Sequence, residues 1–488
     1  MARGTGWRGG LLAAVTAVTL GGAAAAVVTL DEDAPSVAVA PAPSPSAAPV
    51  RGVLLGGARG AEAAPTTAGL QAAVGQVLAD PAIAGRLAVS IVDGVDGRPL
   101  FEQGAGTPLL PASTVKIATA AAALTALPPD RRLSTQVVSG AVPGEVVLVG
   151  GGDPTLSGPG GERDYPASAS LAELAAKVRV SLGAAPVTRV VVDESLYSGE
   201  RVGPGWKPTY LSQGAVAAVG PLMVDGGRVS PDRSPRHADP ALAAGRQLAT
   251  LLAASTPPPA AGDPGAGGPG AAPAPAPPPA RKPGPVDVTR GSAPAAPTLL
   301  GEVFSPTIVA LVERMLARSD NDLAEALARH VALAQGQPAS FAGASVALEQ
   351  VLAPLGVDPA TAVLADGSGL SRSNRIPPSA VTGLLARATS GSNPRLAPLL
   401  TGLPVGGFSG TLAGRYRTGT VAAPGAGAVR AKTGTLEGVS ALAGVVRTND
   451  GRLLAFDLVA DGVPAGANAG AEKALDRLAS SLAACGCR

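Results

Sequence analysis

The chain has 488 residues and a formal net charge of +2 at neutral pH. This length allows two or three domains with a large core, and the 65 glycines and 48 prolines indicate a globular composition with disordered inserts. The basic residues are scattered, so the sequence gives no support for a nucleic-acid-binding surface. Two cysteines and two histidines exclude a disulfide framework and leave few ways to build a His-bearing triad. We predict no metal and no cofactor.

The N-terminal segment has the layout of an export signal. Arg3 and Arg8 precede the apolar run 11–30, which predicts a signal peptide or a signal anchor over residues 1–30. The sequence AVA at 38–40 resembles a cleavage site, but proline follows it, so both alternatives stay open. Residues 31–65 are rich in proline and alanine and predict a tether. Either alternative places the body outside the cytoplasm, with membrane contact only through this segment.

Ordered patterns begin at Thr66. The expected elements, in chain order, are a helix over 66–80, strands over 86–93 and 100–103, and a buried helix over 117–127 that starts near Ser113. Residues 133–256 have a different pattern, in which short apolar runs are separated by glycine and proline turns. They predict an inserted α+β region, with strands in 144–152 and 187–197 and helices over 171–182 and 237–255. Residues 257–298 predict a disordered low-complexity loop.

Order returns in the last third of the chain. Residues 305–336 predict two amphipathic helices broken at SDN, and 430–461 predict three consecutive antiparallel strands with a hairpin turn at NDG. A final helix follows. Residues 66–132 and 299–488 would then form one body of sheet and helices, interrupted by the insert.

Cys485 and Cys487 lie in the terminal sequence ACGCR. A disulfide across one intervening residue would be strained, and two thiols do not make a zinc site. We expect an exposed and frayed terminus.

Ser113 and Lys116 form the pattern STVK at the start of an apolar helix. Ser113 could be a helix cap and Lys116 could extend to water. A cation in the first turn, however, faces the positive end of the helix dipole. Burial and the dipole both disfavour the ammonium, so the pKa of this lysine should fall until its amine can take the serine proton.

Two further motifs follow in chain order. Ser319 and Asn321 belong to SDN, where Ser319 could simply cap the next helix with Asp322 in the capping-box position. Lys432 opens KTGT, in which Gly434 removes a side chain where a backbone or ligand could approach closely. One motif lies at a helix start, one between helices and one on a predicted strand, an order that chance rarely produces.

With STVK, SDN and KTGT, the sequence resembles the penicillin-recognising serine transferase and hydrolase superfamily. More narrowly, it is similar to the D-alanyl-D-alanine carboxypeptidase/endopeptidase family, the class C low-molecular-mass penicillin-binding proteins of the peptidase S13 type. Supporting segments are GGGDPTL (150–156), PGW (204–206) and DGSGLSR (366–372). The resemblance implies an α+β fold of the serine transpeptidase/β-lactamase type, an antiparallel sheet flanked by helices, with a large inserted α+β region.

The resemblance also implies roles. Ser113 would attack the carbonyl between two D-alanines of a peptidoglycan stem peptide, and Lys116 would accept its proton. Ser319 and Asn321 would relay a proton to the leaving amine, while Lys432, Thr433, Gly434 and Thr435 would bind the terminal carboxylate. Backbone N–H groups of Ser113 and Thr435 would form the oxyanion hole. β-Lactams would acylate Ser113 and leave slowly.

Substrate selection is expected to involve Arg372 and Tyr210. Arg372 matches a family position that helps to hold the acidic end of a diaminopimelyl residue. Family members often place an acidic residue shortly after PGW, whereas KPTY with Tyr210 stands here, so an amidated stem peptide is one explanation. We interpret Asp153 in GGGDPTL as a turn residue.

Two alternatives compete with this interpretation. A β-lactamase would use the same serine chemistry with fast deacylation, but the long insert and the anchor-like N-terminus argue against it. A catalytically silent wall-binding scaffold would keep only the fold, and the intact motifs argue against decay.

Overall fold

The computed structural model of the chain describes residues 64–83, 86–159, 167–230, 235–254 and 286–487. The predicted signal or anchor segment, almost all of the tether and most of the low-complexity loop lie outside these residues. Within the described ranges, no helix combines the length and apolar character needed to cross a bilayer.

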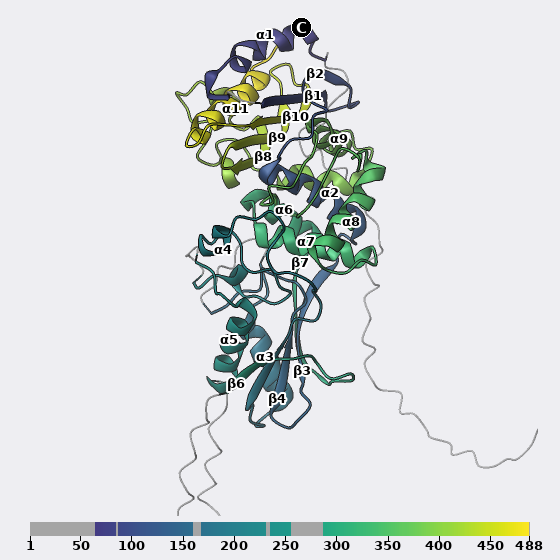
Figure 1. Ribbon diagram of the computed structural model, residues 1–488, viewed down its shortest axis with the longest axis vertical. Coiled ribbons are helices and arrows are strands. Elements are labelled where there is room, and N and C mark those ends of the chain that lie inside the picture. Colours follow the sequence, from purple (N-terminus) through teal and green to yellow (C-terminus); the bar gives the residue numbers. More distant parts are fainter. Residues whose placement is uncertain (1–63, 84–85, 160–166, 231–234, 255–285, 488) are drawn as a thin grey trace, which may run out of the picture. The chain divides into compact units, whose positions relative to one another are not determined.

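The first sheet is antiparallel and has the strand order β2-β1-β10-β9-β8 (Figure 1). Its strands are β1 (Arg86–Asp93), β2 (Pro99–Gln103), β8 (Val429–Leu436), β9 (Val439–Arg447) and β10 (Leu453–Asp461). The three predicted C-terminal strands are confirmed, and NDG lies between β9 and β10. Strands β9 and β10 are buried along almost their whole length, as expected for strands covered on both faces.

Helices cover both faces of this sheet. The helices α1 (Thr67–Leu78) and α11 (Asn468–Ala483) pack on one face around Phe456. The other face packs against α2 (Lys116–Ala126) and a group of surrounding helices. That group comprises α6 (Ile308–Arg318), α7 (Asn321–Ala334), α8 (Phe341–Leu352), α9 (Pro378–Thr389) and α10 (Ala397–Gly402). The predicted buried helix is therefore α2, and its alanines let neighbouring helices approach closely.

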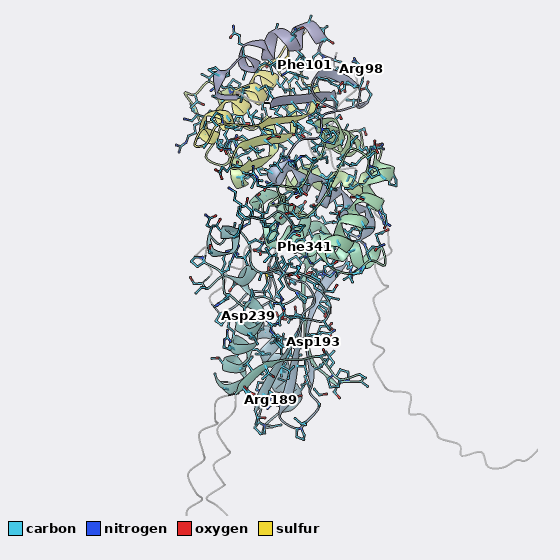
Figure 2. All side chains as sticks on the ribbon, in the orientation of Figure 1. Arg98, Phe101, Arg189, Asp193, Asp239 and Phe341 are labelled. Carbon is cyan, nitrogen blue, oxygen red and sulfur yellow. A yellow bond between two sulfur atoms is a disulfide. The ribbon has the colours of Figure 1, made fainter. Side chains whose placement is uncertain are left out.

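The second sheet has the order β6-β5-β4-β3-β7. Its strands are β3 (Arg132–Ser139), β4 (Glu145–Val149), β5 (Arg189–Asp193), β6 (Asp287–Arg290) and β7 (Leu299–Thr307). Strands β4, β5 and β6 run parallel, and Figure 2 labels Arg189 and Asp193 at the ends of β5. Two helices, α3 (Leu171–Leu182) and α5 (Pro240–Ala254), pack on this sheet and bury its valines and leucines. A short helix, α4 (Thr209–Ser212), lies in the segment that follows β5.

The second sheet corrects two predicted boundaries. Strand β7, which we assigned to the catalytic body from residue 299, pairs with β3 in the second sheet. Strand β6, which we placed in the disordered loop, pairs with β5. Both strands are contributed by chain that returns after the low-complexity segment, so local composition did not reveal their long-range pairing. The remaining domain boundaries stay predictions.

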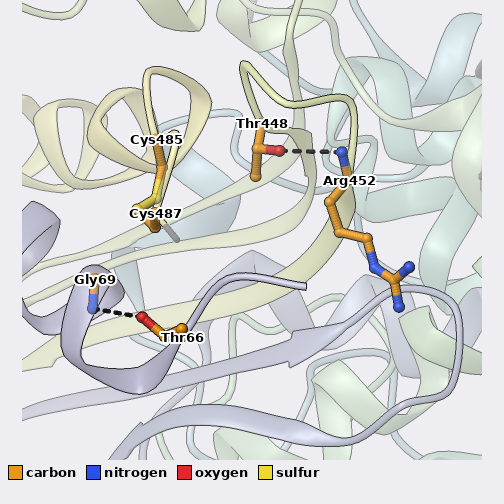
Figure 3. The surroundings of a disulfide bond; sticks show 6 residues. All are labelled: Thr66, Gly69, Thr448, Arg452, Cys485 and Cys487. Carbon is orange, nitrogen blue, oxygen red and sulfur yellow. Dashed lines mark hydrogen bonds between the residues drawn. A yellow bond between two sulfur atoms is a disulfide. The ribbon is translucent and has the colours of Figure 1, made fainter. Parts of the chain in front are cut away.

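The C-terminus also differs from the prediction. Cys485 is 4% exposed within the core beside α1 and α11, and it forms a disulfide with Cys487 (Figure 3). The backbone N–H of Thr66 donates to the carbonyl of Cys487 at 2.8 Å, and the Thr66 hydroxyl caps α1 by accepting from Gly69 at 3.0 Å. The terminus is therefore attached to the start of the ordered chain rather than frayed.

Candidate active site

Ser113 lies in a tight turn, the 3-10 helix η2 (Ala112–Val115), directly before α2. Its neighbour Ala112 has a φ of 48°, which is uncommon for a residue with a Cβ and indicates local strain. A Cβ at Gly369 would lie 2.0 Å from the Ala112 carbonyl, and a Cβ at Gly434 would lie 2.8 Å from the Pro111 carbonyl. The close approach predicted for Gly434 is therefore an approach of backbone, and two glycines from separate motifs allow the surrounding chain to close on the Ser113 turn.

Lys116 is the first residue of α2 and is completely buried. Its Nζ lies 3.1 Å from Ser113 Oγ and 2.7 Å from Asn321 Oδ1, and it also donates to the Ser368 carbonyl. Burial lowers the pKa of Lys116 to about 8, against the opposing effect of nearby carboxylates, chiefly Asp366 and Glu325. The fall in pKa that we predicted for this lysine is thus confirmed in direction, with burial as its main cause.

The SDN motif connects α6 to α7. Ser319 ends α6 with a left-handed φ of 56°, and Asp320 caps α7 by accepting from the Leu323 N–H at 3.0 Å. The alternative in which Ser319 caps the helix is therefore wrong, because Asp320 takes that place. The left-handed turn leaves the Ser319 hydroxyl available to Lys432, whose Nζ donates to it at 2.8 Å.

Asn321 links Lys116 to the inserted region. Its side-chain oxygen accepts from Lys116, and its Nδ2 donates to the Ala215 carbonyl at 2.9 Å. Asp322 is buried, accepts from the Ala217 N–H at 2.7 Å and pairs with Arg236 at 3.0 Å. Two neighbouring residues of α7 therefore hold the segment around Ala215 beside the site.

The KTGT motif lies on β8, at the edge of the first sheet. Lys432 is buried and also donates to the Thr433 carbonyl at 2.7 Å. Burial, with the charge of Lys116 as a second cause, lowers the pKa of Lys432 well below its ordinary value. A substrate carboxylate arriving here would favour the charged form. The Thr433 and Thr435 hydroxyls bond to Thr411 at 3.0 Å and to Glu472 at 2.7 Å respectively.

A cleft of about 530 Å³ opens beside Ser113, and we call it the nucleophile cleft. Asn321, Thr435 and Tyr210 line it with Ser113. Arg372 lies in an adjoining cavity, where its Nη1 donates to the Glu437 carbonyl at 3.1 Å. The two spaces share Lys207 and Glu437, which form an exposed ion pair. The structure thus brings the three motifs together and sets Arg372 at one side of the cleft.

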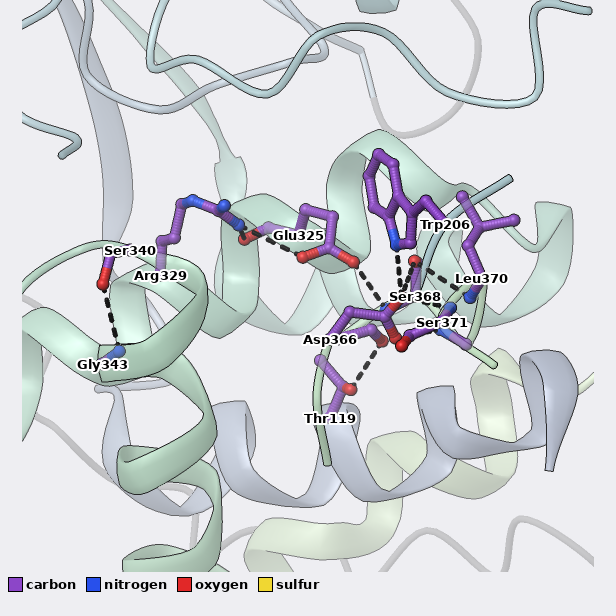
Figure 4. Close-up of polar contacts among 12 residues, drawn as sticks. Thr119, Trp206, Glu325, Arg329, Ser340, Gly343, Asp366, Ser368, Leu370 and Ser371 are labelled. Atoms are coloured by element: carbon purple, nitrogen blue, oxygen red, sulfur yellow. Dashed lines mark hydrogen bonds and ion pairs between the residues drawn. The ribbon is translucent and has the colours of Figure 1, made fainter. Parts of the chain in front are cut away.

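Sequence reasoning missed a buried carboxylate that organises the site. Asp366 accepts from Trp206 Nε1 at 2.7 Å and from the N–H groups of Gly369 at 2.8 Å and Ser371 at 2.6 Å (Figure 4). These bonds shape the loop whose Ser368 carbonyl accepts from Lys116. Asp366 is the first residue of the segment DGSGLSR, from which the sequence analysis predicts a role only for Arg372. The segment therefore contained the signal that could have identified Asp366.

Glu325 was missed as well. This buried residue of α7 accepts from the Ser368 N–H at 2.9 Å and pairs with Arg329 at 3.2 Å. Burial, together with the charge of Asp366, raises the pKa of Glu325 to about 7. No local pattern distinguishes it from an ordinary helix glutamate, because only the fold brings it to the Ser368 loop.

Asp153 is a turn residue, as predicted. It is buried, and its Oδ1 accepts from the Thr155 N–H at 2.8 Å and the Thr155 hydroxyl at 2.6 Å. Burial raises the pKa of this carboxyl to about 6.

Comparison with known sequences gives one consistent result. The profile of the D-Ala-D-Ala carboxypeptidase 3 (S13) family matches residues 70–251 and 284–482. A carboxypeptidase of Mycobacterium tuberculosis is 38% identical over 431 residues, which cover 87% of this chain and 86% of the relative. A D-alanyl-D-alanine carboxypeptidase of an Actinomadura species is 32% identical, covering 79% of this chain and 80% of the relative.

The fold matches a solved structure. Penicillin-binding protein 4 of Haemophilus influenzae superposes with a TM-score of 0.60 at 22% identity, covering 82% of this chain and 94% of that one. A second structure of the same protein, in complex with a β-lactam, superposes with a TM-score of 0.56 at 21% identity, with the same coverage. The predicted α+β fold with an antiparallel sheet flanked by helices is therefore confirmed.

Proposed function

Because the chain belongs to the D-Ala-D-Ala carboxypeptidase 3 (S13) family and is a serine-type D-Ala-D-Ala carboxypeptidase, we propose that it trims and de-crosslinks peptidoglycan stem peptides through an acyl-enzyme on Ser113. The observation that carries this proposal is the 3.1 Å separation of Ser113 Oγ from Lys116 Nζ, inside a site completed by Asn321. An amine with a pKa of about 8 suits a general base for a serine hydroxyl.

Acylation begins when Ser113 attacks the carbonyl between two D-alanines and its proton passes to the Lys116 amine. The developing oxyanion is stabilised by the backbone N–H groups of Ser113 and Thr435, which line the same cleft. Ser319 and Asn321 then relay a proton to the leaving amine, and the bond between the alanines breaks. Water subsequently attacks the acyl-enzyme and releases the shortened peptide.

Lys432 recognises the terminal carboxylate, with Thr433 and Thr435 donating hydrogen bonds to it. The hydrogen bond from Lys432 to Ser319 supports a link between carboxylate binding and the proton relay. A carboxylate beside Lys432 keeps that lysine charged while Lys116 loses its proton, so the two buried lysines take different roles.

β-Lactams act as inhibitors in this proposal, since they mimic the end of the stem peptide and acylate Ser113. The N-terminal apolar run 11–30 supports a place outside the cytoplasm, secreted or anchored to the outer face of the cytoplasmic membrane.

The first test uses wild-type enzyme and the Ser113→Ala variant. Wild type should release D-alanine from a D-Ala-D-Ala pentapeptide and form a persistent adduct with labelled penicillin, seen by mass spectrometry. The variant should do neither. Release or labelling that survives in the variant contradicts the proposal, and rapid turnover of penicillin would instead indicate a β-lactamase.

Stem-peptide selection rests on Arg372 and Tyr210. We propose that Arg372 holds the diaminopimelyl end of the stem and that the enzyme prefers an amidated residue there, because Tyr210 and the paired Lys207 and Glu437 line this side of the cleft. Hydrolysis of free and amidated stem peptides at equal rates would contradict this preference.

A further inference from the structure

A third cavity, of about 710 Å³, opens beside the SDN motif, and we call it the arginine cavity. Ser319, Asn321 and Thr411 line it, and it shares Ala215 and Asn321 with the nucleophile cleft. It therefore begins at the residues assigned to the leaving amine. None of the roles proposed so far uses its remaining walls.

Those walls are strongly basic. Among the described residues, four arginines line the cavity, against one aspartate, Asp320, whose side chain already caps α7. The arginines are Arg228, Arg236, Arg314 and Arg318. Such a concentration of one charge around one space attracts anions.

The arginines come from two elements that place like charges together. Arg228 and Arg236 stand opposite each other in an antiparallel bridge of the inserted region. Arg314 and Arg318 are four residues apart on α6, directly before Ser319. Like charges are destabilising at both spacings. Carboxylates behind the walls offset part of this repulsion, since Asp322 pairs with Arg236 and Asp225 interacts with Arg228 and Arg314. A bound anion would offset the rest.

Within the part of the chain that the structure describes, several buried guanidinium N–H groups have no hydrogen-bond partner. The Arg236 side chain is 6% exposed, and although its Nη2 pairs with Asp322, its Nε and Nη1 are buried without a hydrogen bond. Nε and Nη1 of Arg314 are likewise buried without a hydrogen bond. Arg228 Nη1 donates to the Asp225 carbonyl at 3.0 Å. Unsatisfied buried donors are costly, and carboxylates are the ligands that guanidinium groups bind with two parallel hydrogen bonds.

We infer that the arginine cavity binds the leaving half of a cross-linked peptide through carboxylates of that peptide. This inference rests on the proposed function, because Ser319 and Asn321 define the leaving side. A departing D-alanine has one carboxylate, which Lys432 binds. This single residue is too small to fill the arginine cavity as well. A second peptide chain attached through its amine brings further carboxylates past Ser319 and fills the cavity. The enzyme is thereby an endopeptidase selective for acidic cross-links.

The test compares three substrates with the full-length enzyme. They are a D-Ala-D-Ala pentapeptide, a cross-linked peptide dimer with free carboxylates on the leaving strand, and the same dimer with those carboxylates amidated. Wild type should cleave the acidic dimer with a kcat/KM about tenfold above that of the amidated dimer.

The Arg228→Gln/Arg314→Gln double variant removes two of the charges and leaves the buried Arg236 and Asp322 pair intact. In this variant, the kcat/KM for the acidic dimer, divided by that for the pentapeptide, should fall about tenfold, and the preference for the acidic dimer should disappear. The Arg228→Lys/Arg314→Lys variant, which keeps the charges, should retain part of that preference. Arg246→Gln, on an exposed position of α5, is the control and should behave as wild type.

The outcomes separate this inference from the proposed function. If wild type releases D-alanine and retains penicillin but treats both dimers alike, only the arginine cavity is wrongly assigned. If the double variant loses activity on all three substrates in proportion, the arginines support the fold, and the inference is overturned. If wild type neither releases D-alanine nor binds penicillin, the proposed function falls and takes this inference with it. Penicillin labelling of the double variant shows that it is folded.

Discussion

Lys116 is wholly buried, and two opposing effects set its basicity. Burial lowers its pKa from 10.5, while Asp366 and Glu325 raise it, and the balance is about 8. The pKa of a lysine in an apolar core without these carboxylates would fall further. The carboxylates that sequence reasoning missed are thus part of the chemistry that it predicted.

The acylation rate should follow the deprotonation of Lys116. Below pH 8 the neutral fraction falls, so the acylation rate constant should drop about tenfold per pH unit and level off above pH 8. Stopped-flow measurement with a chromogenic β-lactam between pH 6 and pH 9 checks this profile. Lys116→Arg, which keeps its proton, should be slower by about 10³-fold. A wild-type profile that is flat across this range would exclude Lys116 as the base.

Asp457 is another buried ionisable residue, outside the three motifs. It lies on β10, is 1% exposed, and its Oδ1 has no hydrogen-bond partner among the described residues. Burial raises its pKa to about 8. Between the ordinary carboxyl pKa and pH 8, the unfolded chain releases a proton that the folded protein keeps, so stability falls as pH rises through this window.

Asp457→Asn should remove that loss. The amide stays neutral at every pH. The free energy of unfolding of the variant, relative to wild type, should therefore rise little at pH 5 and up to about 4 kcal/mol more at pH 8. Thermal unfolding at both pH values measures it, with a rise in Tm expected at pH 8. An equal change in Tm at pH 5 and pH 8 would show that ionisation of Asp457 is not the cause.

At the scale of elements, the site depends on how closely β8 approaches the turn before α2. Gly434 lies on β8 where a Cβ would be 2.8 Å from the Pro111 carbonyl. Backbone cannot yield as a flexible side chain does, so a methyl group there must move the strand or the Ser113 turn. The strand carries Lys432 and Thr435, and the turn carries Ser113.

Gly434→Ala should therefore lower kcat/KM for D-alanine release about 10²-fold, because a displacement near 1 Å is enough for such a loss. Tm should fall by only a few degrees. The matched control is Gly75→Ala on α1, where an added Cβ meets nothing within 4 Å and helix propensity favours alanine. Unchanged activity of Gly434→Ala would mean that the close contact does not hold the site.

Elements also show where sequence patterns succeed and where they stop. The strands β9 and β10 are mostly apolar runs around a recognisable turn, so both were predicted. The break between α6 and α7 was predicted at SDN, but its geometry was not. In the structure Ser319 ends α6 in a left-handed conformation and Asp320 caps α7. Strand β6 is only four residues long and follows a low-complexity segment, and its pairing with β5 cannot be read locally.

For the molecule as a whole, the inserted region completes the site. Trp206 comes from that region, donates to Asp366 at 2.7 Å, and packs edge-on against Phe341 with ring centroids 5.5 Å apart. Asp366 in turn shapes the Ser368 loop that accepts from Lys116. Through these contacts a residue outside the three motifs helps to position Lys116.

Trp206→Phe should test this connection. The ring still packs on Phe341, but Asp366 loses one donor, a change that costs about 1 to 3 kcal/mol when the acceptor is buried. D-Alanine release should fall about tenfold, with a shifted pH profile because the loop contacts Lys116. Phe341→Leu keeps the Trp206 donor and serves as the comparison. If both variants lose activity equally without a pH shift, Trp206 acts only through packing.

The sequence by itself determined the chemistry that we propose: three short motifs, each built from neighbouring residues, predict the nucleophile, its base and the carboxylate-binding strand. Hydrophobic periodicity likewise determined most helices and the C-terminal strands, because these patterns are local. Only the tertiary structure decided that Asp366 and Glu325 lie around Lys116, that Cys485 is buried, and that four arginines from two regions face one cavity beside Ser319. The physical reason is that burial, like-charge convergence and hydrogen-bond satisfaction depend on residues far apart in the chain, and folding alone brings them together.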